Sequence, residues 1–228
     1  MPPSLAIIAA LPREIASLVQ GVQPDSALLR RRIHLYRLPA AIVVAAGMGA
    51  SRATLAVEAA LSAGSITTLI SAGLAGACTP SLAPGDVVEA STVIAVDTGE
   101  RFTTSASPLC ILASSSTIAS VQEKHRLAAT YNAALVDMEA ATVARLALAH
   151  RLQFRAIKAI SDAHDFELEA LNRFATAQGQ FRTAAFALHT ALRPATWSAA
   201  AQLGRNSQFA LRALHTRLQQ VIAAEPLP

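Results

Sequence analysis

The stretch Ala134-Leu-Val-Asp-Met-Glu-Ala-Ala-Thr-Val-Ala-Arg-Leu-Ala-Leu-Ala149, together with Phe154-Arg-Ala-Ile-Lys-Ala-Ile-Ser-Asp162, decides the fold class. It begins as a short apolar strand, continues from Glu139 with apolar residues at helical spacing, and ends in a second apolar run of strand length. Strands that alternate with helices are typical of an α/β protein with a parallel or mixed sheet. We therefore expect a helix-covered sheet.

The same alternation continues on both sides of this stretch. We expect further strands at 5–10, 30–38, 40–46, 67–71, 87–96 and 111–113, and helices at 13–19, 50–63 and 123–130. Residues 174–222 predict two or three more helices, interrupted at Pro194 and Gly204. The predicted fold is a single-domain, three-layer α/β/α structure with a mixed, largely parallel sheet. Residues 1–172 would form the catalytic domain, and residues 173–228 a helical extension packed on the same domain.

Composition favours one globular domain in a reducing setting. The 228 residues are 53% hydrophobic but only 4% aromatic, because much of the apolar content is alanine, which suits helix–sheet contacts. The two cysteines, Cys78 and Cys110, are too few for a disulfide scaffold, and neither they nor the six histidines have metal-ligand spacing. We therefore expect a cytoplasmic protein that uses no metal and no organic cofactor.

The positive charge is concentrated in the C-terminal tail. The net charge is +4, and residues 173–228 carry six arginines and one glutamate, which leaves the rest of the chain near neutral. Basicity confined to a tail argues against a nucleic-acid enzyme. The tail could instead rest on an anionic lipid surface, or it could be a solvated helix face or a dimer contact. Its basic residues and aromatic anchor are Arg173, Arg182, Arg193, Arg205, Arg212, Arg217 and Trp197.

Two carboxylates lie where predicted strands end, the position at which α/β proteins bind ligands. Glu139 stands where a strand becomes a helix. It could accept hydrogen bonds from the vicinal hydroxyls of a ribose, or it could be a first-turn acid that the helix dipole stabilises. Asp162 ends the strand 154–160, where it could act as a general acid or cap the next helix.

Three further candidates occupy the same kind of position. Glu14 follows the first strand and could be catalytic or a solvated first-turn glutamate. Gly47-Met48-Gly49 separates a strand from a helix and could bind an anion or form a structural turn. Gly73 belongs to a second glycine-containing segment, Ser71–Gly76. Because these segments share one edge of the predicted sheet, we expect a single site there.

Val136-Asp-Met-Glu-Ala-Ala141 and Lys158-Ala-Ile-Ser-Asp162 resemble the signature of the nucleoside phosphorylase family, which includes the methylthioadenosine/S-adenosylhomocysteine nucleosidases. Leu11-Pro-Arg-Glu14, the two glycine segments and Pro84-Gly-Asp86 are similar to further family motifs. Within the family, the short region around Glu123, the Asp-Met-Glu variant and the helical tail most resemble the hopanoid-associated phosphorylases. That branch implies an adenosylhopane-like substrate.

The resemblance implies a reaction: cleavage of the N-glycosidic bond of an adenine-type purine nucleoside, by hydrolysis or by phosphorolysis with inorganic phosphate as co-substrate. Asp162 would donate a proton or a hydrogen bond to purine N7, and Glu14 would activate water or position the nucleophile. Glu139 would hold the ribose hydroxyls, with Met138 packed against the sugar. The remaining predicted site residues are the anion or sugar loops, Gly47, Met48, Gly49 and Gly73, and the base-side residues Ser161 and Lys158. A homodimer is also implied.

Several features leave alternatives open. Lys158 stands where the nucleosidases carry arginine, and residues 113–117 lack the family's base-stacking segment. Arg13 and Arg52 flank the candidate loops and could bind phosphate or be solvated helix residues. A non-catalytic protein that binds nucleosides on the same fold is therefore the alternative to an enzyme.

Overall fold

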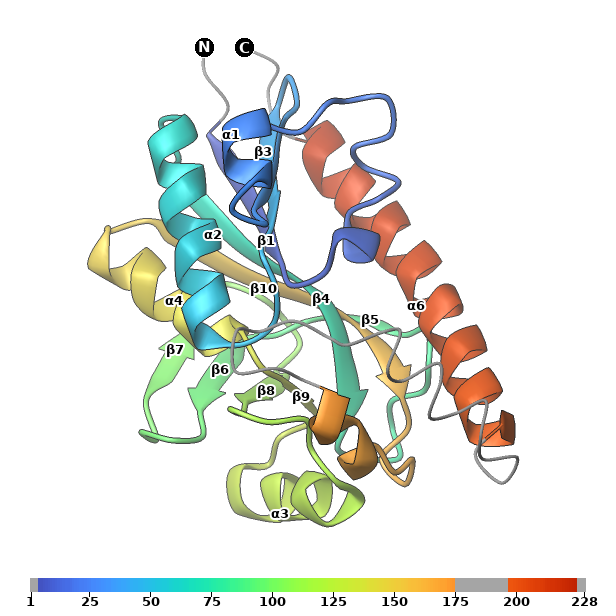
Figure 1. Cartoon of the computed structure of the whole chain (residues 1–228). Helices are drawn as coiled ribbons and strands as arrows, with labels where there is room; N and C mark the ends of the chain where they lie inside the picture. The colour runs from blue at the N-terminus through green and yellow to red at the C-terminus, as the bar shows by residue number, and fades with distance from the viewer. Residues whose placement is uncertain (1–3, 175–196, 225–228) are drawn as a thin grey trace.

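A ten-stranded mixed sheet forms the centre of the computed structural model, which describes residues 4–174 and 197–224 (Figure 1). The strands follow the order β2-β3-β1-β4-β9-β8-β6-β7, and β10 pairs with β4 and β5 off this path. Their bounds are β1 Leu5–Ala9, β2 His34–Arg37, β3 Ala41–Ala45, β4 Thr68–Ala77, β5 Val87–Glu89, β6 Thr92–Ala95, β7 Arg101–Thr103, β8 Ile111–Ser114, β9 Leu135–Asp137 and β10 Gln153–Asp162.

Most inner strands pair in parallel, except that β4 and β9 are antiparallel. β1 lies parallel to β3 and β4, β4 to β10, and β8 to β6 and β9, whereas β2, β5 and β7 are antiparallel to their partners. Every residue of β1 and β3 is buried, as expected for strands covered on both faces. The predicted mixed, largely parallel sheet is therefore confirmed.

Helices cover both faces of the sheet and complete three layers (Figure 1). α2 and α4 pack together on one face, α6 lies across the other, and α3 lies beyond the ends of β8 and β9. The α-helices are α1 Ser26–Leu29, α2 Ala50–Ala63, α3 Val121–Tyr131, α4 Ala140–Ala149 and α6 Trp197–Ala224, and the 3-10 helices are η1 Pro12–Glu14 and η2 Glu169–Phe174.

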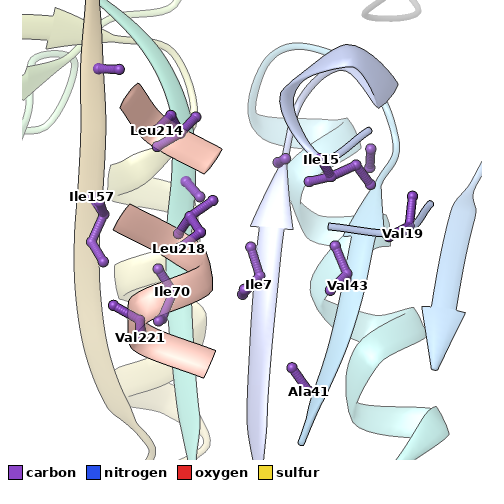
Figure 2. Packing of buried hydrophobic residues seen from close by; sticks show 14 of the residues in the cluster. Ile7, Ile15, Val19, Ala41, Val43, Ile70, Ile157, Leu214, Leu218 and Val221 are labelled. Carbon is purple, nitrogen blue, oxygen red and sulfur yellow. The ribbon is translucent and has the colours of Figure 1, made fainter. Parts of the chain in front are cut away.

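The apolar face of α6 belongs to the main core. Leu214, Leu218 and Val221 approach Ile70 of β4 and Ile157 of β10, and the same cluster extends over β1 and β3 (Figure 2). These three residues of α6 are at most 5% exposed, because they recur at helical spacing and face the sheet. The C-terminal helix is therefore an integral cover of the sheet.

Two predicted boundaries were wrong near glycines. The strand expected at 67–71 continues to Ala77 through Gly73 and Gly76, because β10 and then β9 pair with it along this length. Gly204 does not interrupt a helix, since α6 runs unbroken from Trp197 to Ala224. Pro194 lies outside the described residues.

Two further expectations near strand ends need correction. The helix expected at 13–19 is only the 3-10 helix η1 followed by turns, which place the buried Ile15 and Val19 over the sheet. The single strand expected at 87–96 is divided into β5 and β6, which pair with different partners, β10 and β8. The predicted boundary between residues 172 and 173 falls inside η2, and the division of the chain there stays a prediction.

Candidate active site

A cavity of about 600 Å³ opens where β1, β4, β9 and β10 end. Its wall includes Glu14, Glu139 and Asp162, and α6 forms the opposite part of the lining through Leu203 and Leu211. Glu14 and Asp162 are 4% and 3% exposed. Three carboxylates far apart in the chain are thus brought together at one ligand-sized hollow, which is the convergence that their strand-end positions predicted.

Glu14 is fixed by backbone amides from the turn after β1 and from β4. Its Oε2 accepts hydrogen bonds from the N–H groups of Ala10 and Leu11 at 3.0 and 2.8 Å, and Oε1 accepts one from Leu74 at 3.0 Å. Gly73 makes this approach possible, because its φ is +154° and a Cβ there would lie 3.0 Å from Oε1. The alternative of a solvated first-turn glutamate is therefore wrong.

Glu139 and Asp137 divide two tasks at the start of α4. Asp137 Oδ2 accepts a hydrogen bond from Ala140 N at 3.0 Å and so stabilises the helix start. Glu139 occupies the N-cap position without capping the helix, and its Oε1 instead accepts from Gly49 N, 2.7 Å away. Burial, followed by the neighbouring charge of Asp137, raises the pKa of Glu139 to about 7.

Lys158 lies behind the cavity wall, not on its base side. Its Nζ is 2.8 Å from Asp137 Oδ2 and donates to Ser71 Oγ at 3.0 Å, and the residue is 1% exposed. Burial acts to lower the pKa of Lys158, but the charges of Asp137 and Glu139 outweigh it and raise the pKa. The base-side expectation for Lys158 is therefore corrected: it compensates the buried charge of Asp137.

Asp162 ends β10 with both carboxylate oxygens engaged. Oδ1 accepts from Ser161 Oγ at 2.6 Å, and Oδ2 accepts from Lys124 Nζ at 2.5 Å. Gly76 of β4 leaves room for this pair, since a Cβ there would lie only 2.7 Å from Oδ2. Asp162 is the last residue of a strand, so the helix-capping alternative does not apply. Ser161 also lines the cavity, as expected for a base-side residue.

The glycine loop between β3 and α2 contributes mainly backbone. Gly47 N donates to Ala10 O at 2.8 Å and Gly49 N to Glu139, so both amides are occupied by protein atoms. Met48 and Met138 both line the cavity, whereas Gly47, Gly49 and Gly73 are not part of its lining. An anion at this loop would therefore have to displace existing hydrogen bonds.

Sequence reasoning missed Lys124 and the α6 side of the cavity. Lys124 lies three residues before the buried Leu127, so it falls on the apolar face of α3, and a buried lysine there was a readable signal. The α6 lining had no local signal, because nothing in a remote amphipathic helix shows which strand ends it reaches. Its cavity-lining residues are Ala200, Leu203, Gly204, Ser207, Gln208 and Leu211.

Two features, a metal-binding side-chain cluster and a membrane-spanning helix, are absent from the described residues. Within 4–174 and 197–224, no group of three or more His, Cys, Asp or Glu side chains is arranged to hold a metal ion. No helix in the same ranges is long and apolar enough to cross a membrane.

Solved structures of nucleosidases share this fold. A mutant of the Helicobacter pylori methylthioadenosine nucleosidase, with 5'-methylthioadenosine in its active site, has a TM-score of 0.72 at 16% identity and covers 98% of this chain and 99% of its own. The nucleosidase of Neisseria meningitidis, in complex with methylthio-immucillin-A, has a TM-score of 0.67 at 17% identity, covering 96% and 97%. A futalosine hydrolase mutant of Helicobacter pylori has a TM-score of 0.62 at 19% identity, and the match covers 75% of this chain and 92% of its own.

The layered sheet and the carboxylate-lined cavity define an α/β protein of the nucleoside phosphorylase and nucleosidase fold. The family model described as "Phosphorylase superfamily" matches residues 4–111 and 110–193. The chain therefore belongs to the phosphorylase superfamily. A search of curated protein sequences gave no match.

Proposed function

We propose that this protein hydrolyses the N-glycosidic bond of an adenine-type purine nucleoside and releases the free base. The observation that carries the proposal is the placement of Glu14, Glu139 and Asp162 on the wall of one cavity of about 600 Å³. A cavity of this size suits a small ligand, and bond cleavage at an anomeric carbon uses several carboxylates around a cation-like sugar.

Each carboxylate has a task that its surroundings support. Glu139 would accept hydrogen bonds from the ribose hydroxyls, with Met138 packed against the sugar. Asp162 would act at purine N7, so that the electron pair of the broken bond leaves with a neutral base. Glu14 would take a proton from water as the water oxygen bonds to the anomeric carbon. The negative charges also stabilise the positive charge that develops on the ribose.

Hydrolysis is favoured over phosphorolysis because the groups that would bind phosphate are already engaged. The amides of Ala10, Leu11 and Leu74 donate to Glu14. Arg52 donates from Nε to the carbonyl of Ala46 and from Nη2 to that of Arg32. Of the cations described on the cavity wall, Lys124 is paired with Asp162, which leaves the exposed Arg13 as a partner for a dianion.

A base-release assay tests the proposal directly. Adenosine and 5'-methylthioadenosine are incubated with the purified protein, with and without inorganic phosphate, and free adenine is quantified. We expect release that does not depend on phosphate, and a loss of about 10²-fold or more in Asp162→Asn. Dependence on phosphate would make the enzyme a phosphorylase. Tight nucleoside binding without turnover would support a non-catalytic binding protein instead.

The lining from α6 supports a substrate with an apolar 5' group. Leu203 and Leu211 of α6 line the cavity together with Leu168 and Leu171, and Gly204 leaves space beside them. Two structural neighbours bind adenine-type ligands with a methylthio group. A larger, adenosylhopane-like nucleoside would extend the same contact. The kcat/KM values of a 5'-alkylthioadenosine series should rise with chain length; a decline from adenosine onward would oppose this substrate class.

Assembly and surface contact remain proposals. The exposed Arg205 and Arg212 of α6 could bind an anionic membrane that contains a lipid-like substrate. Arg182 and Arg193 lie outside the described residues, as does the side chain of Arg173. Sedimentation with anionic vesicles at low and high salt tests the contact, and light scattering tests for a homodimer of twice the 23.7 kDa chain mass.

A further inference from the structure

Lys124 and Asp162 form a buried ion pair on the cavity wall. The side chains are 1% and 4% exposed, and Nζ lies 2.5 Å from Oδ2. Nζ also donates to the carbonyl oxygens of Ala163 and Phe166, at 2.9 and 3.0 Å. All three ammonium protons therefore have acceptors, and the ammonium group is held in one place by the segment that follows β10.

This geometry changes what Asp162 can do by itself. A carboxylate that accepts from an ammonium group on one oxygen and from Ser161 on the other is in its ionised form, which has no proton to give. A purine base leaves poorly as an anion, so a proton must reach it from somewhere. Lys124 is the nearest group that carries one, across a single hydrogen bond from Asp162.

Cys78, Glu123 and His164, which lie near the pair in the sequence or the fold, do not offer a competing proton route. Burial raises the pKa of Cys78 to about 12, so its thiol remains neutral. Glu123, the neighbour of Lys124 on α3, is paired with Arg126 at 2.6 Å. His164, in the segment after Asp162, lies with its ring 6.1 Å from that of His125, and neither ring is part of the cavity lining.

We propose that Lys124 supplies the proton that the departing base acquires and that Asp162 passes it on, an inference that rests on the proposed glycosidic-bond cleavage. The proton moves from Nζ to Oδ2 and from there to a ring nitrogen of the base. The electrons of the C–N bond leave with the base, the oxygen of water bonds to the anomeric carbon, and Glu14 takes the proton that this water loses. Lys124 ends as a neutral amine next to an ionised Asp162, and solvent returns its proton after the base departs.

A structural role alone accounts poorly for this pair. Burying two charges carries a large desolvation cost, and buried ion pairs are often no more stabilising than apolar residues of similar size. A buried ion pair on the wall of a ligand cavity is more typical of a functional site than of a purely structural contact. The pair also lies beside Gly76, where a larger residue would displace it.

Two variants separate proton supply from charge. Lys124→Met removes both the charge and the proton, whereas Lys124→Arg keeps the charge but has a guanidinium group that does not give up its proton. With adenosine as substrate, we expect both variants to lose about 10²-fold or more in kcat. The rate of each variant relative to wild type at the same pH should rise as pH falls, because Asp162 must then take its proton from solvent.

An activated substrate provides the matched control. 4-Nitrophenyl β-D-ribofuranoside has a leaving group that departs without protonation, so both variants should hydrolyse it within about tenfold of the wild-type rate. Full activity of Lys124→Arg on adenosine with the wild-type pH profile would overturn the inference, as would an equal loss on both substrates. If Lys124→Met does not fold, the pH profile of Lys124→Arg decides alone. Wild-type protein that releases no base would instead overturn the proposed function.

Discussion

At the scale of single residues, neighbouring acids in one short motif do different work. Asp137 caps α4 and is compensated by Lys158, and this arrangement leaves the side chain of Glu139 free to face the cavity. Asp137 Oδ1 is the one buried side-chain oxygen among the described residues for which the protein provides no hydrogen-bond partner. This oxygen is itself buried, so the unused acceptor lies within the protein and not on the accessible wall of the cavity.

The pKa of Glu139 predicts a pH-dependent stability. Its folded-state value of about 7 lies above the ordinary value of 4.5, so its contribution is fully present below pH 4.5 and is lost as pH rises through 7. Wild type should therefore lose stability relative to Glu139→Gln as pH rises. The difference in free energy of unfolding, Glu139→Gln minus wild type, should increase by on the order of 1–3 kcal/mol from pH 5 to pH 8. Urea unfolding at both pH values measures it, and an unchanged difference would contradict the raised pKa.

Substitution of Gly76 should lower catalytic activity more than it lowers stability. The Cβ of Gly76→Ala would lie 2.7 Å from Asp162 Oδ2 and 3.1 Å from Lys124 Cε, so the ion pair must shift. We expect kcat for base release to fall by about tenfold or more, since catalysis is sensitive to small displacements. Gly99→Ala is the control, because its φ of +74° is strained for alanine but no atom lies within 4 Å. That variant should lose stability and keep its activity.

At the scale of secondary-structure elements, α6 has two segments with separate roles. One segment packs Leu214, Leu218 and Val221 on β4 and β10 (Figure 2), and the preceding turns of the same helix line the cavity. His215 links the two, because its Nε2 lies 3.0 Å from the carbonyl oxygen of Glu14. The helix that completes the core is thus connected directly to the segment that carries a site carboxylate.

Leu214 tests the packing role of this helix. Leu214→Ala removes a side chain that is 0% exposed and should lower the free energy of unfolding by about 2–5 kcal/mol, through lost burial and the cavity that remains. Leu148→Ala, on the outer face of α4 and 68% exposed, should change it by less than about 0.5 kcal/mol. Similar values for both variants in denaturant titrations would show that α6 does not cover the core.

At the scale of the whole molecule, the sheet needs covers on both faces. Ile70 and Ile157 lie under α6, whereas α2 and α4 bury the opposite face, so no single layer is dispensable (Figure 1). The predicted division of the chain at residues 172 and 173 stays a prediction, and α6 packs on the sheet formed by residues 5–162. Residues 197–224 are distant in sequence from β4 but form an outer layer that packs on β4 and β10 (Figure 1).

Truncation tests this statement. A chain that ends at residue 196 lacks α6 and would expose the apolar face of β4 and β10 to water, so we expect it to lose cooperative unfolding. The full chain should unfold in one transition by circular dichroism. A truncated protein that retains the same transition would show that residues 4–174 form an independent domain and that α6 is an accessory.

The sequence by itself determined the fold class and the candidate carboxylates, because both depend on local patterns. Apolar runs alternating with helical spacing predicted a helix-covered, largely parallel sheet, and the carboxyl ends of such strands meet at one edge. Glu14, Glu139 and Asp162 could therefore be named from their positions. The extent of β4 could not, since its glycines suggested a loop and only pairing with β9 and β10 extends it.

Only the tertiary structure decided which charges compensate one another and what closes the cavity. Lys124 meets Asp162 across 38 positions of sequence, Gly49 meets Glu139 across 90, and His215 meets Glu14 across 201. No periodicity encodes such contacts, because they arise from how whole elements pack. For that reason Lys158 appeared to face the base although it is paired behind the wall, and Lys124, the residue beside the proposed acid, was not identified.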